Sequence, residues 1–125
     1  MIRFSENRLK AIFENFAGKK VLVLGDLMLD RYLWGEVSRI SPEAPVPVVE
    51  ITREFSRLGG AANVGNNIRS LGGTPFLVGV IGQDNMGKEV LTLLQERNLP
   101  QDGIVATPSR PTTVKTRVIL SLIHI

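Results

Sequence analysis

The residues with the clearest chemical potential lie in a glycine-rich stretch in the middle of the chain, residues 58–67. Gly59 and Gly60 run into small residues, and apolar residues at helical spacing follow until a second glycine pair, Gly72-Gly73. A helix that begins on glycines exposes its first backbone N–H groups, so a ligand oxygen can approach without meeting a Cβ atom. Asn63 lies in or near the first turn, where its amide can donate to and accept from hydroxyls. This stretch therefore suits a polyhydroxy ligand, a phosphate, or both.

Two common nucleotide-binding glycine loops do not fit this stretch. A P-loop needs Gly-Lys-Ser/Thr after its second glycine, and the sequence contains no such triplet. A dinucleotide fingerprint needs Gly-x-Gly-x-x-Gly directly after a strand, which Gly59-Gly60 followed by Gly65 does not match. Taken alone, the stretch leaves open a helix start whose glycines serve only tight packing.

Composition narrows the class of protein. The chain has 125 residues, 43% of them hydrophobic, a formal net charge of +3 and no cysteine. Thiol catalysis and disulfides are therefore excluded, and the single histidine, His124, offers no metal cluster. Apolar runs fall short of the roughly 18 residues that span a bilayer, and the first residues lack the order of a signal peptide. The basic residues are scattered, so we expect a cytoplasmic protein with neither a membrane nor a nucleic-acid partner.

The pattern along the chain indicates an α/β protein. Ser5 can cap a first helix that ends at Gly18, and residues 21–24 form a continuously apolar strand expected to be buried on both faces. A similar strand at 76–81 is followed by a helix that Asp84 can cap and that runs to about Asn98. Alternation of this kind predicts a right-handed parallel sheet.

Three further segments read as strands of another kind. Residues 31–37 and 46–52 are strand-prone but are interrupted by Pro42, Pro45 and Pro47, so they belong at an edge or in a small separate sheet. Residues 112–119 alternate, with Lys115 and Arg117 on one face. Together they predict a half-buried lid over a site; the alternative is an ordinary antiparallel edge of the main sheet.

Five segments in order resemble the ribokinase-like (PfkB) sugar kinases, and within that family the branch that acts on heptose 7-phosphate. These segments are residues 23–30, 38–48, 59–63, 82–87 and 113–117, and the likeness covers nearly all of residues 8–119. The resemblance implies a ribokinase-like three-layer α/β sandwich with a mostly parallel sheet and a small projecting β-lid, incomplete in this chain. Residues 1–119 would be the N-terminal, sugar-binding half, with lid strands at about 31–53 and 112–119. Residues 120–125 depart from the family pattern.

The resemblance also implies a site. Asp30, Gly59, Gly60 and Asn63 would contact the sugar, so that the glycine stretch serves the acceptor and not the nucleotide. A carboxylate such as Asp30 is a pure acceptor for hydroxyl donors. The substrate implied is D-glycero-D-manno-heptose 7-phosphate, phosphorylated at its anomeric hydroxyl on the route to ADP-heptose and the lipopolysaccharide core. Its existing phosphate requires cations, and Arg39, Lys115 and Arg117 are the candidates.

The part of the family that performs the chemistry is not found in this sequence. The family's catalytic base is the aspartate of a later Gly-x-Gly-Asp motif, which does not occur here and is expected C-terminal to Ile125. The complete enzyme would use ATP and Mg²⁺, whose site lies in that later half. We therefore expect the 125-residue chain to be inactive and poorly stable or aggregating, and residues 120–125 to mark a truncation or a foreign tail.

The sequence leaves two alternative functions open and suggests one assembly. The chain could belong to another PfkB kinase with a different sugar, although the Ser41-Pro42-Glu43-Ala44-Pro45 string favours the heptose branch. It could instead be a non-catalytic sugar-binding or dimerisation module. Because lid strands can pair between subunits, we also expect a homodimer of the full-length protein.

Overall fold

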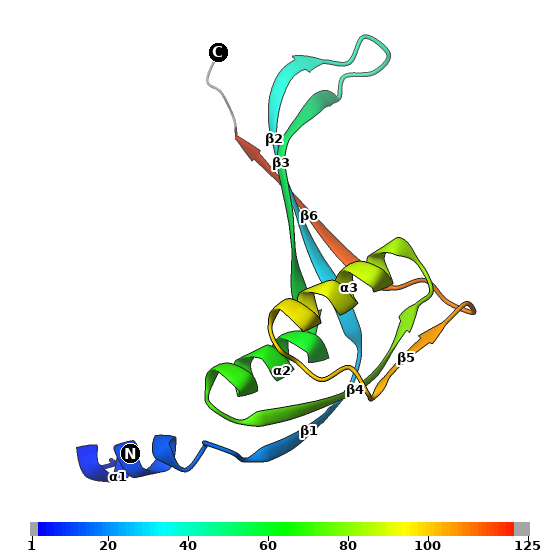
Figure 1. Ribbon diagram of the computed structural model, residues 1–125. Helices are drawn as coiled ribbons and strands as arrows, with labels where there is room; N and C mark the ends of the chain where they lie inside the picture. Colours follow the sequence, from blue (N-terminus) through cyan, green and yellow to red (C-terminus); the bar gives the residue numbers. More distant parts are fainter. Residues whose placement is uncertain (1–2, 122–125) are drawn as a thin grey trace.

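The computed structural model describes residues 3–121, and its elements follow the predicted alternation closely (Figure 1). In chain order they are α1 (Glu6–Glu14), β1 (Lys20–Leu24), β2 (Leu27–Ile40), β3 (Pro47–Gly60), α2 (Ala61–Ser70), β4 (Thr74–Gly82), α3 (Asn85–Glu96), β5 (Ile104–Thr107) and β6 (Thr113–Ser121). Of the expected tail, residues 122–125 lie outside the described part. Within residues 3–121 no helix is long and apolar enough to cross a membrane.

The main sheet is parallel, as predicted, and has the order β1-β4-β5. The short strand β5 was not predicted, because its four residues follow a loop without a clear alternating pattern. Helices α2 and α3 cover one face of this sheet. Their buried residues pack on Leu77 and Ile81 of β4 to form the core, which also contains Ala62, Val90, Leu94 and Leu99.

The prediction that residues 21–24 are buried on both faces is wrong. Leu22 and Leu24 are 67% and 76% exposed, and they share a face with the exposed Phe76 of β4. That face of the sheet has no covering layer among the described elements, and β1 is an edge strand there. The apolar run is typical of a strand that is buried on both faces. In this chain only the face of β1 opposite to Leu22 and Leu24 is turned towards a helix.

The other three strands form a second sheet, which we call the lid, with the order β3-β2-β6. Strands β2 and β3 are antiparallel, whereas β6 runs parallel to β2. The lid projects well away from the main sheet (Figure 1). This confirms the small separate sheet and rules out the alternative of an ordinary edge of the main sheet.

The lid strands extend further than their sequence patterns indicated. Strands β2 and β3 each contain 14 residues, and both continue down to the main sheet. Pro47 begins β3, and Pro42 and Pro45 lie in the turn before it, where no ladder hydrogen bond is lost. At the other end of β3, Gly59 and Gly60 are the last strand residues, and Gly60 is the N-cap of α2. The lid is therefore joined directly to the glycine-started helix.

Two predicted helix caps are also confirmed. The Ser5 side chain accepts a hydrogen bond from the backbone N–H of Arg8 at 3.3 Å. The Asp84 carboxylate accepts one from Gly87 N–H at 2.7 Å. Both satisfy donors that the first turn of a helix leaves without partners.

Candidate functional site

Asp30 lies on β2 near the base of the lid, where the lid meets the main sheet. Its side chain is 17% exposed. In the sheet register Asp30 stands opposite Lys115 of β6 on one side and Arg57 of β3 on the other. Because directly opposed residues of neighbouring strands share a face, the three side chains lie on the same face of the lid.

Two of the predicted cations contact this carboxylate. The Lys115 ammonium lies 3.3 Å and the Arg117 guanidinium 3.2 Å from Oδ1 of Asp30. Arg117 also donates to the Tyr32 hydroxyl at 3.2 Å, and its guanidinium lies over the Tyr32 ring. The sequence placed Lys115 and Arg117 on one strand face, and the parallel pairing of β6 with β2 brings both to Asp30.

The glycine pair is shaped by the same strands. A methyl group on Gly59 would lie 3.0 Å from the Asp30 carboxyl group and 2.8 Å from the Met28 side chain. Gly60 has φ of +56°, which favours glycine, and its Cα faces the Asp26 carbonyl oxygen too closely for a side chain. That carbonyl accepts a 2.9 Å hydrogen bond from Ala61 N–H, so Asp26 holds the start of α2 through its backbone. The glycines therefore allow the strand, the carboxylate and the helix to meet.

Asn63, two residues into α2 after Ala61, lines a pocket beside the lid. The pocket has a volume of about 240 Å³, and its other lining residues are Arg57, Leu58, Asn66, Leu93 and Arg97. Two amides and two guanidiniums give it many donors, which suits an oxygen-rich ligand. Asn63 of α2 thus lines the same pocket as Arg57 of β3, the residue that stands opposite Asp30.

Arg39 is not brought to this group. It lies on β2 near the tip of the lid, where it pairs in register with Val48. Nine residues of extended strand separate it from Asp30, or roughly 30 Å at about 3.3 Å per residue. Within one copy of this chain, Arg39 and Asp30 cannot hold the same small molecule.

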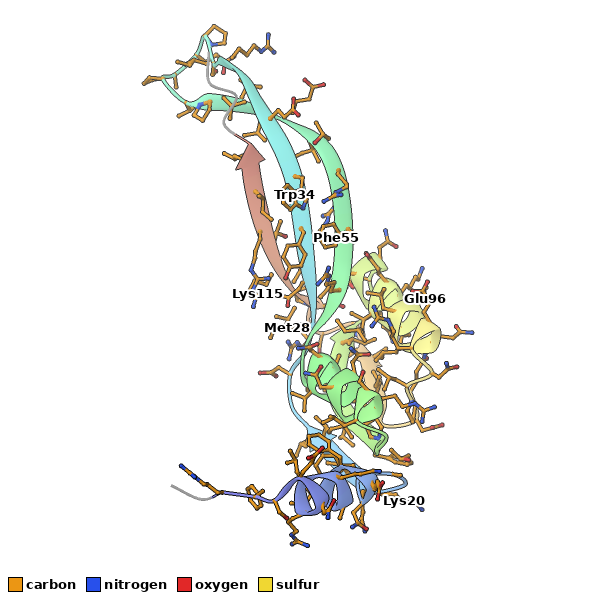
Figure 2. All side chains as sticks on the ribbon, turned by 90° about the vertical axis from the view of Figure 1, so that its left-hand side faces the viewer. Lys20, Met28, Trp34, Phe55, Glu96 and Lys115 are labelled. Carbon is orange, nitrogen blue, oxygen red and sulfur yellow. The ribbon has the colours of Figure 1, made fainter. Side chains whose placement is uncertain are left out.

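Sequence reasoning missed an alternation of arginine and aromatic side chains on the Asp30 face of the lid. Figure 2 labels two of the aromatic residues, Trp34 and Phe55, on the lid strands. The rings of Tyr32 and Phe55 stack at 4.9 Å. Arg57 lies 5.2 Å from the Phe55 ring, and Arg53 lies 5.1 Å from the Trp34 ring. Arg53, Phe55 and Arg57 occur at alternate positions in the sequence, which was the available signal. These contacts favour cations that are held in place by aromatic faces.

A separate hydrogen-bond network fixes the base of β6 to the main sheet. The Asp84 carboxylate accepts from Thr112 N–H at 2.8 Å and from the Thr112 hydroxyl at 2.7 Å. Thr112 is only 5% exposed, and its hydroxyl oxygen accepts from Gly82 N–H at 2.9 Å. Three hydrogen bonds hold the pKa of Asp84 below its ordinary value. The largest effect comes from Thr112 N–H, the next from the Thr112 hydroxyl and the third from Gly87 N–H. The turn after β4 therefore positions the strand that carries Lys115 and Arg117.

The described carboxylates are dispersed and do not form a cluster of metal ligands. Within residues 3–121 there is no group of three histidine, cysteine, aspartate or glutamate side chains that could hold a metal ion. The Asp30 carboxylate is engaged by two cations, and that of Asp84 by Thr112 and Gly87. Both cations contact Oδ1 of Asp30, whereas Thr112 and Gly87 together engage both oxygens of Asp84.

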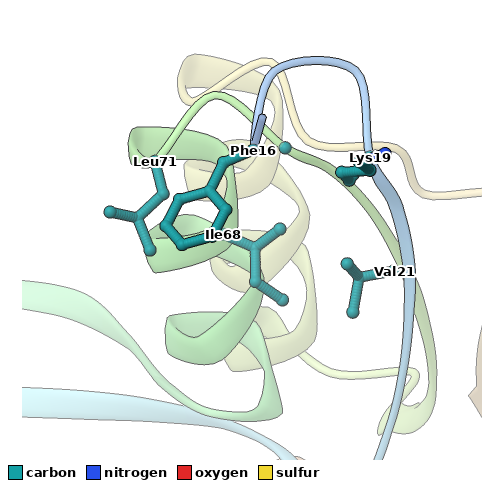
Figure 3. A pocket seen from close by; sticks show the side chains of 6 residues that line it. Phe16, Lys19, Val21, Ile68 and Leu71 are labelled. Carbon is teal, nitrogen blue, oxygen red and sulfur yellow. The ribbon is translucent and has the colours of Figure 1, made fainter. Parts of the chain in front are cut away.

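A second pocket lies at the opposite end of β1 and α2 from the glycine pair (Figure 3). Its volume is about 140 Å³, and apart from Lys19 its lining is apolar, with Phe16, Val21, Ile68 and Leu71. Such a lining offers few hydrogen-bonding groups to a sugar. The candidate site is therefore the group around Asp30 and not this cleft.

Comparison with known proteins identifies relatives of this chain. The family profile described as pfkB family carbohydrate kinase matches residues 18–121. The chain is 54% identical over 101 residues to the bifunctional protein HldE of Helicobacter pylori (strain P12). This match covers 81% of the chain and 22% of that protein. It is 52% identical over 111 residues to the bifunctional protein HldE of Magnetococcus marinus, covering 89% of this chain and 23% of that protein. The chain thus spans less than a quarter of these relatives.

Solved structures show the same fold. Arabidopsis thaliana ribokinase complexed with ribose and ATP superposes with a TM-score of 0.65 at 19% identity, covering 83% of this chain and 33% of that one. Xylella fastidiosa fructokinase with bound ATP gives a TM-score of 0.56 at 24% identity, covering 78% and 26%. The predicted ribokinase-like α/β fold is confirmed, with the chain matching about a third or less of each structure.

Proposed function

Because the chain belongs to the pfkB family of carbohydrate kinases, we propose that it is the acceptor-binding part of a heptose 7-phosphate kinase. The complete kinase would transfer the γ-phosphoryl group of ATP to the anomeric hydroxyl of D-glycero-D-manno-heptose 7-phosphate. Identity above 50% to two HldE proteins supports this branch over another sugar kinase of the family. The fold alone would not support this branch, because enzymes that act on different substrates share it.

The observation that carries the proposal is the contact of Asp30 with Lys115 and Arg117 at 3.3 and 3.2 Å. A carboxylate can accept hydrogen bonds from the sugar hydroxyls, and the two cations beside it can attract a phosphate, so the group matches both ends of a sugar phosphate. Each charge-assisted hydrogen bond contributes about 1.5–3 kcal/mol. Gly59 leaves the carboxylate accessible, because any side chain there would crowd it.

In this proposal the nucleotide, its Mg²⁺ and the catalytic base belong to a part of the kinase beyond Ile125. ATP would supply the phosphoryl group, and Mg²⁺ would neutralise charge on its phosphates. The described residues contribute acceptor binding and the lid. The 125-residue chain by itself is therefore expected to bind the sugar phosphate without turning it over.

We also propose that two full-length copies associate through their lids. The lid exposes several apolar side chains away from the core, among them Ile40, Ile51, Val118 and Leu120. Burial of such residues between two lids would remove apolar surface from water. Sedimentation of the full-length protein with and without Val118→Asp tests this, since a dimer held by the lid should dissociate in the variant.

A chimera tests the proposed activity. In it, this chain replaces the aligned segment of the 54% identical Helicobacter pylori HldE, so that the acceptor half is joined to a complete remainder. We expect ATP-dependent phosphorylation of heptose 7-phosphate. A folded chimera that phosphorylates a different sugar would indicate another branch of the family, and one that binds sugar without turnover would favour a non-catalytic module.

A further inference from the structure

We propose that Arg57 binds the phosphate that the acceptor already carries, and thereby makes the site selective for phosphorylated sugars. This inference rests on the proposed function and adds a residue to it. Arg57 is neither part of the glycine pair nor one of the two cations on β6. The structure places it at the junction of the Asp30 face and the polar pocket.

The position of Arg57 is set by the register of the lid. Arg57 of β3 stands directly opposite Asp30 of β2, as Lys115 does from the other side. A ligand whose hydroxyls reach Asp30 therefore has a cation on each flank. With Cβ atoms of opposed residues about 4.5–5.5 Å apart, a single sugar phosphate can span this distance.

The two flanks differ in how much positive charge is available. Lys115 and Arg117 both contact the Asp30 carboxylate, so an incoming phosphate must share them with that anion. Among residues 3–121, Arg57 has no carboxylate within ion-pair distance, and its recorded contacts are with aromatic rings. A guanidinium without an anionic partner is the stronger attraction for a dianionic phosphate.

Aromatic contacts hold the Arg57 guanidinium in place. It lies 5.2 Å from the Phe55 ring and 5.9 Å from the Tyr32 ring, and those two rings stack on each other. An arginine stacked in this way keeps its N–H groups free at the edge of the guanidinium plane. Fewer side-chain conformations are then lost when a phosphate binds.

The pocket beside Arg57 provides space and further donors for the phosphate. Its volume of about 240 Å³ is bounded by β3, α2 and the end of α3. Glu96 marks that end of α3 in Figure 2. Arg97 supplies a second guanidinium, which Asn66 orients through a 3.4 Å hydrogen bond. Two arginines and two amides around one pocket suit a phosphomonoester attached to a polyhydroxy chain.

The experiment compares Arg57→Gln with Arg57→Lys and with the matched control Arg53→Gln. Arg53 is also an exposed arginine stacked on aromatic rings of the same lid face, but it does not line the pocket. The chimera is titrated calorimetrically with heptose 7-phosphate and with the unphosphorylated heptose, and circular dichroism verifies the fold of each variant. The same variants are then assayed in the chimera for KM with both sugars.

We expect Arg57→Gln to weaken binding of heptose 7-phosphate and to raise its KM about tenfold or more, equivalent to about 1.4 kcal/mol or more. Binding of the unphosphorylated heptose should be unchanged, Arg57→Lys should recover part of the loss, and Arg53→Gln should resemble the wild-type chain. Equal effects of Arg57→Gln on both sugars, or no effect on either, would overturn the role of Arg57 while leaving the proposed function intact. A folded chimera with the wild-type segment that recognises neither sugar would instead refute the proposed function.

Discussion

Arg117 and Asp30 are 87 residues apart in the sequence, yet Nη1 of Arg117 lies 3.2 Å from Oδ1 of Asp30. The contact exists because β6 returns to the lid and pairs in parallel with β2, with Asp30 opposite Lys115. The proposed acceptor site is therefore built on the lid strands themselves, at the point where they meet the main sheet. Any movement of β6 would displace two cations from the carboxylate together.

Replacing the carboxylate should separate hydroxyl recognition from phosphate attraction. In the chimera, we expect Asp30→Asn to lower kcat/KM for heptose 7-phosphate by about 10–100-fold, since one or two charge-assisted hydrogen bonds are weakened. Lys115 and Arg117 would lose their anionic partner, so inorganic phosphate should become a stronger competitive inhibitor. Unchanged kcat/KM in a folded Asp30→Asn chimera would contradict the assignment of Asp30.

The cations of β6 should contribute to affinity for the phosphorylated substrate. We expect Lys115→Ala and Arg117→Ala each to raise the KM for heptose 7-phosphate by about three- to tenfold, because both side chains are partly exposed and screened by solvent. Lys10→Ala on α1 provides a control for the loss of one surface charge. Unchanged KM in both β6 variants would exclude them as phosphate ligands.

Gly60 should tolerate substitution less well than Gly18, which also has a positive φ but has no neighbouring atom within 4 Å of an added Cβ. Gly60 and Gly18 both have positive φ, at +56° and +72°, but only Gly60 faces a backbone oxygen where a Cβ would lie. Gly18→Ala should cost about 1–2 kcal/mol from its left-handed backbone alone. Gly60→Ala should cost more than that, as measured by urea unfolding of the chain. Equal costs would mean that the contact with Asp26 relaxes freely.

Removal of the Thr112 hydroxyl should loosen the base of the lid. Thr112→Val leaves the buried Gly82 N–H without an acceptor, at a cost of about 1–3 kcal/mol. Thr92→Val removes a hydroxyl from the exposed side of α3 and should stay within about 0.5 kcal/mol of wild type. Hydrogen exchange of β6 amides should accelerate in Thr112→Val alone. Protection equal to that of wild type would show that β6 does not depend on this contact.

The same network predicts a dependence of stability on acidity. Hydrogen bonds from Thr112 and Gly87 lower the pKa of Asp84 in the folded chain relative to the unfolded one. Their contribution is therefore fully present above the ordinary aspartate pKa of about 3.9 and is lost as pH falls from there through the folded pKa. Unfolding midpoints of wild type and Asp84→Asn, compared between pH 6 and pH 3, should converge at the lower pH. A constant difference would contradict the assignment.

The local elements were predictable because their signals are local. Caps such as Ser5 and Asp84, the glycine start of α2 and the alternation around Lys115 act over a few residues, and each was confirmed. The burial of residues 21–24 was not predictable in this way. Their composition suits a strand covered on both sides, but exposure depends on which layers the chain itself supplies.

The sequence alone predicts the chemical groups: a carboxylate, a glycine-started helix, two cations on one strand face, and the fold that such segments favour. Which of these groups meet depends on the tertiary structure. Strand pairing brought Lys115 and Arg117 to Asp30, placed Arg57 opposite the same carboxylate, and left Arg39 at the distant tip of the lid. The physical reason is that register across strands far apart in the chain depends on the packing of the whole sheet, which no short stretch of sequence encodes.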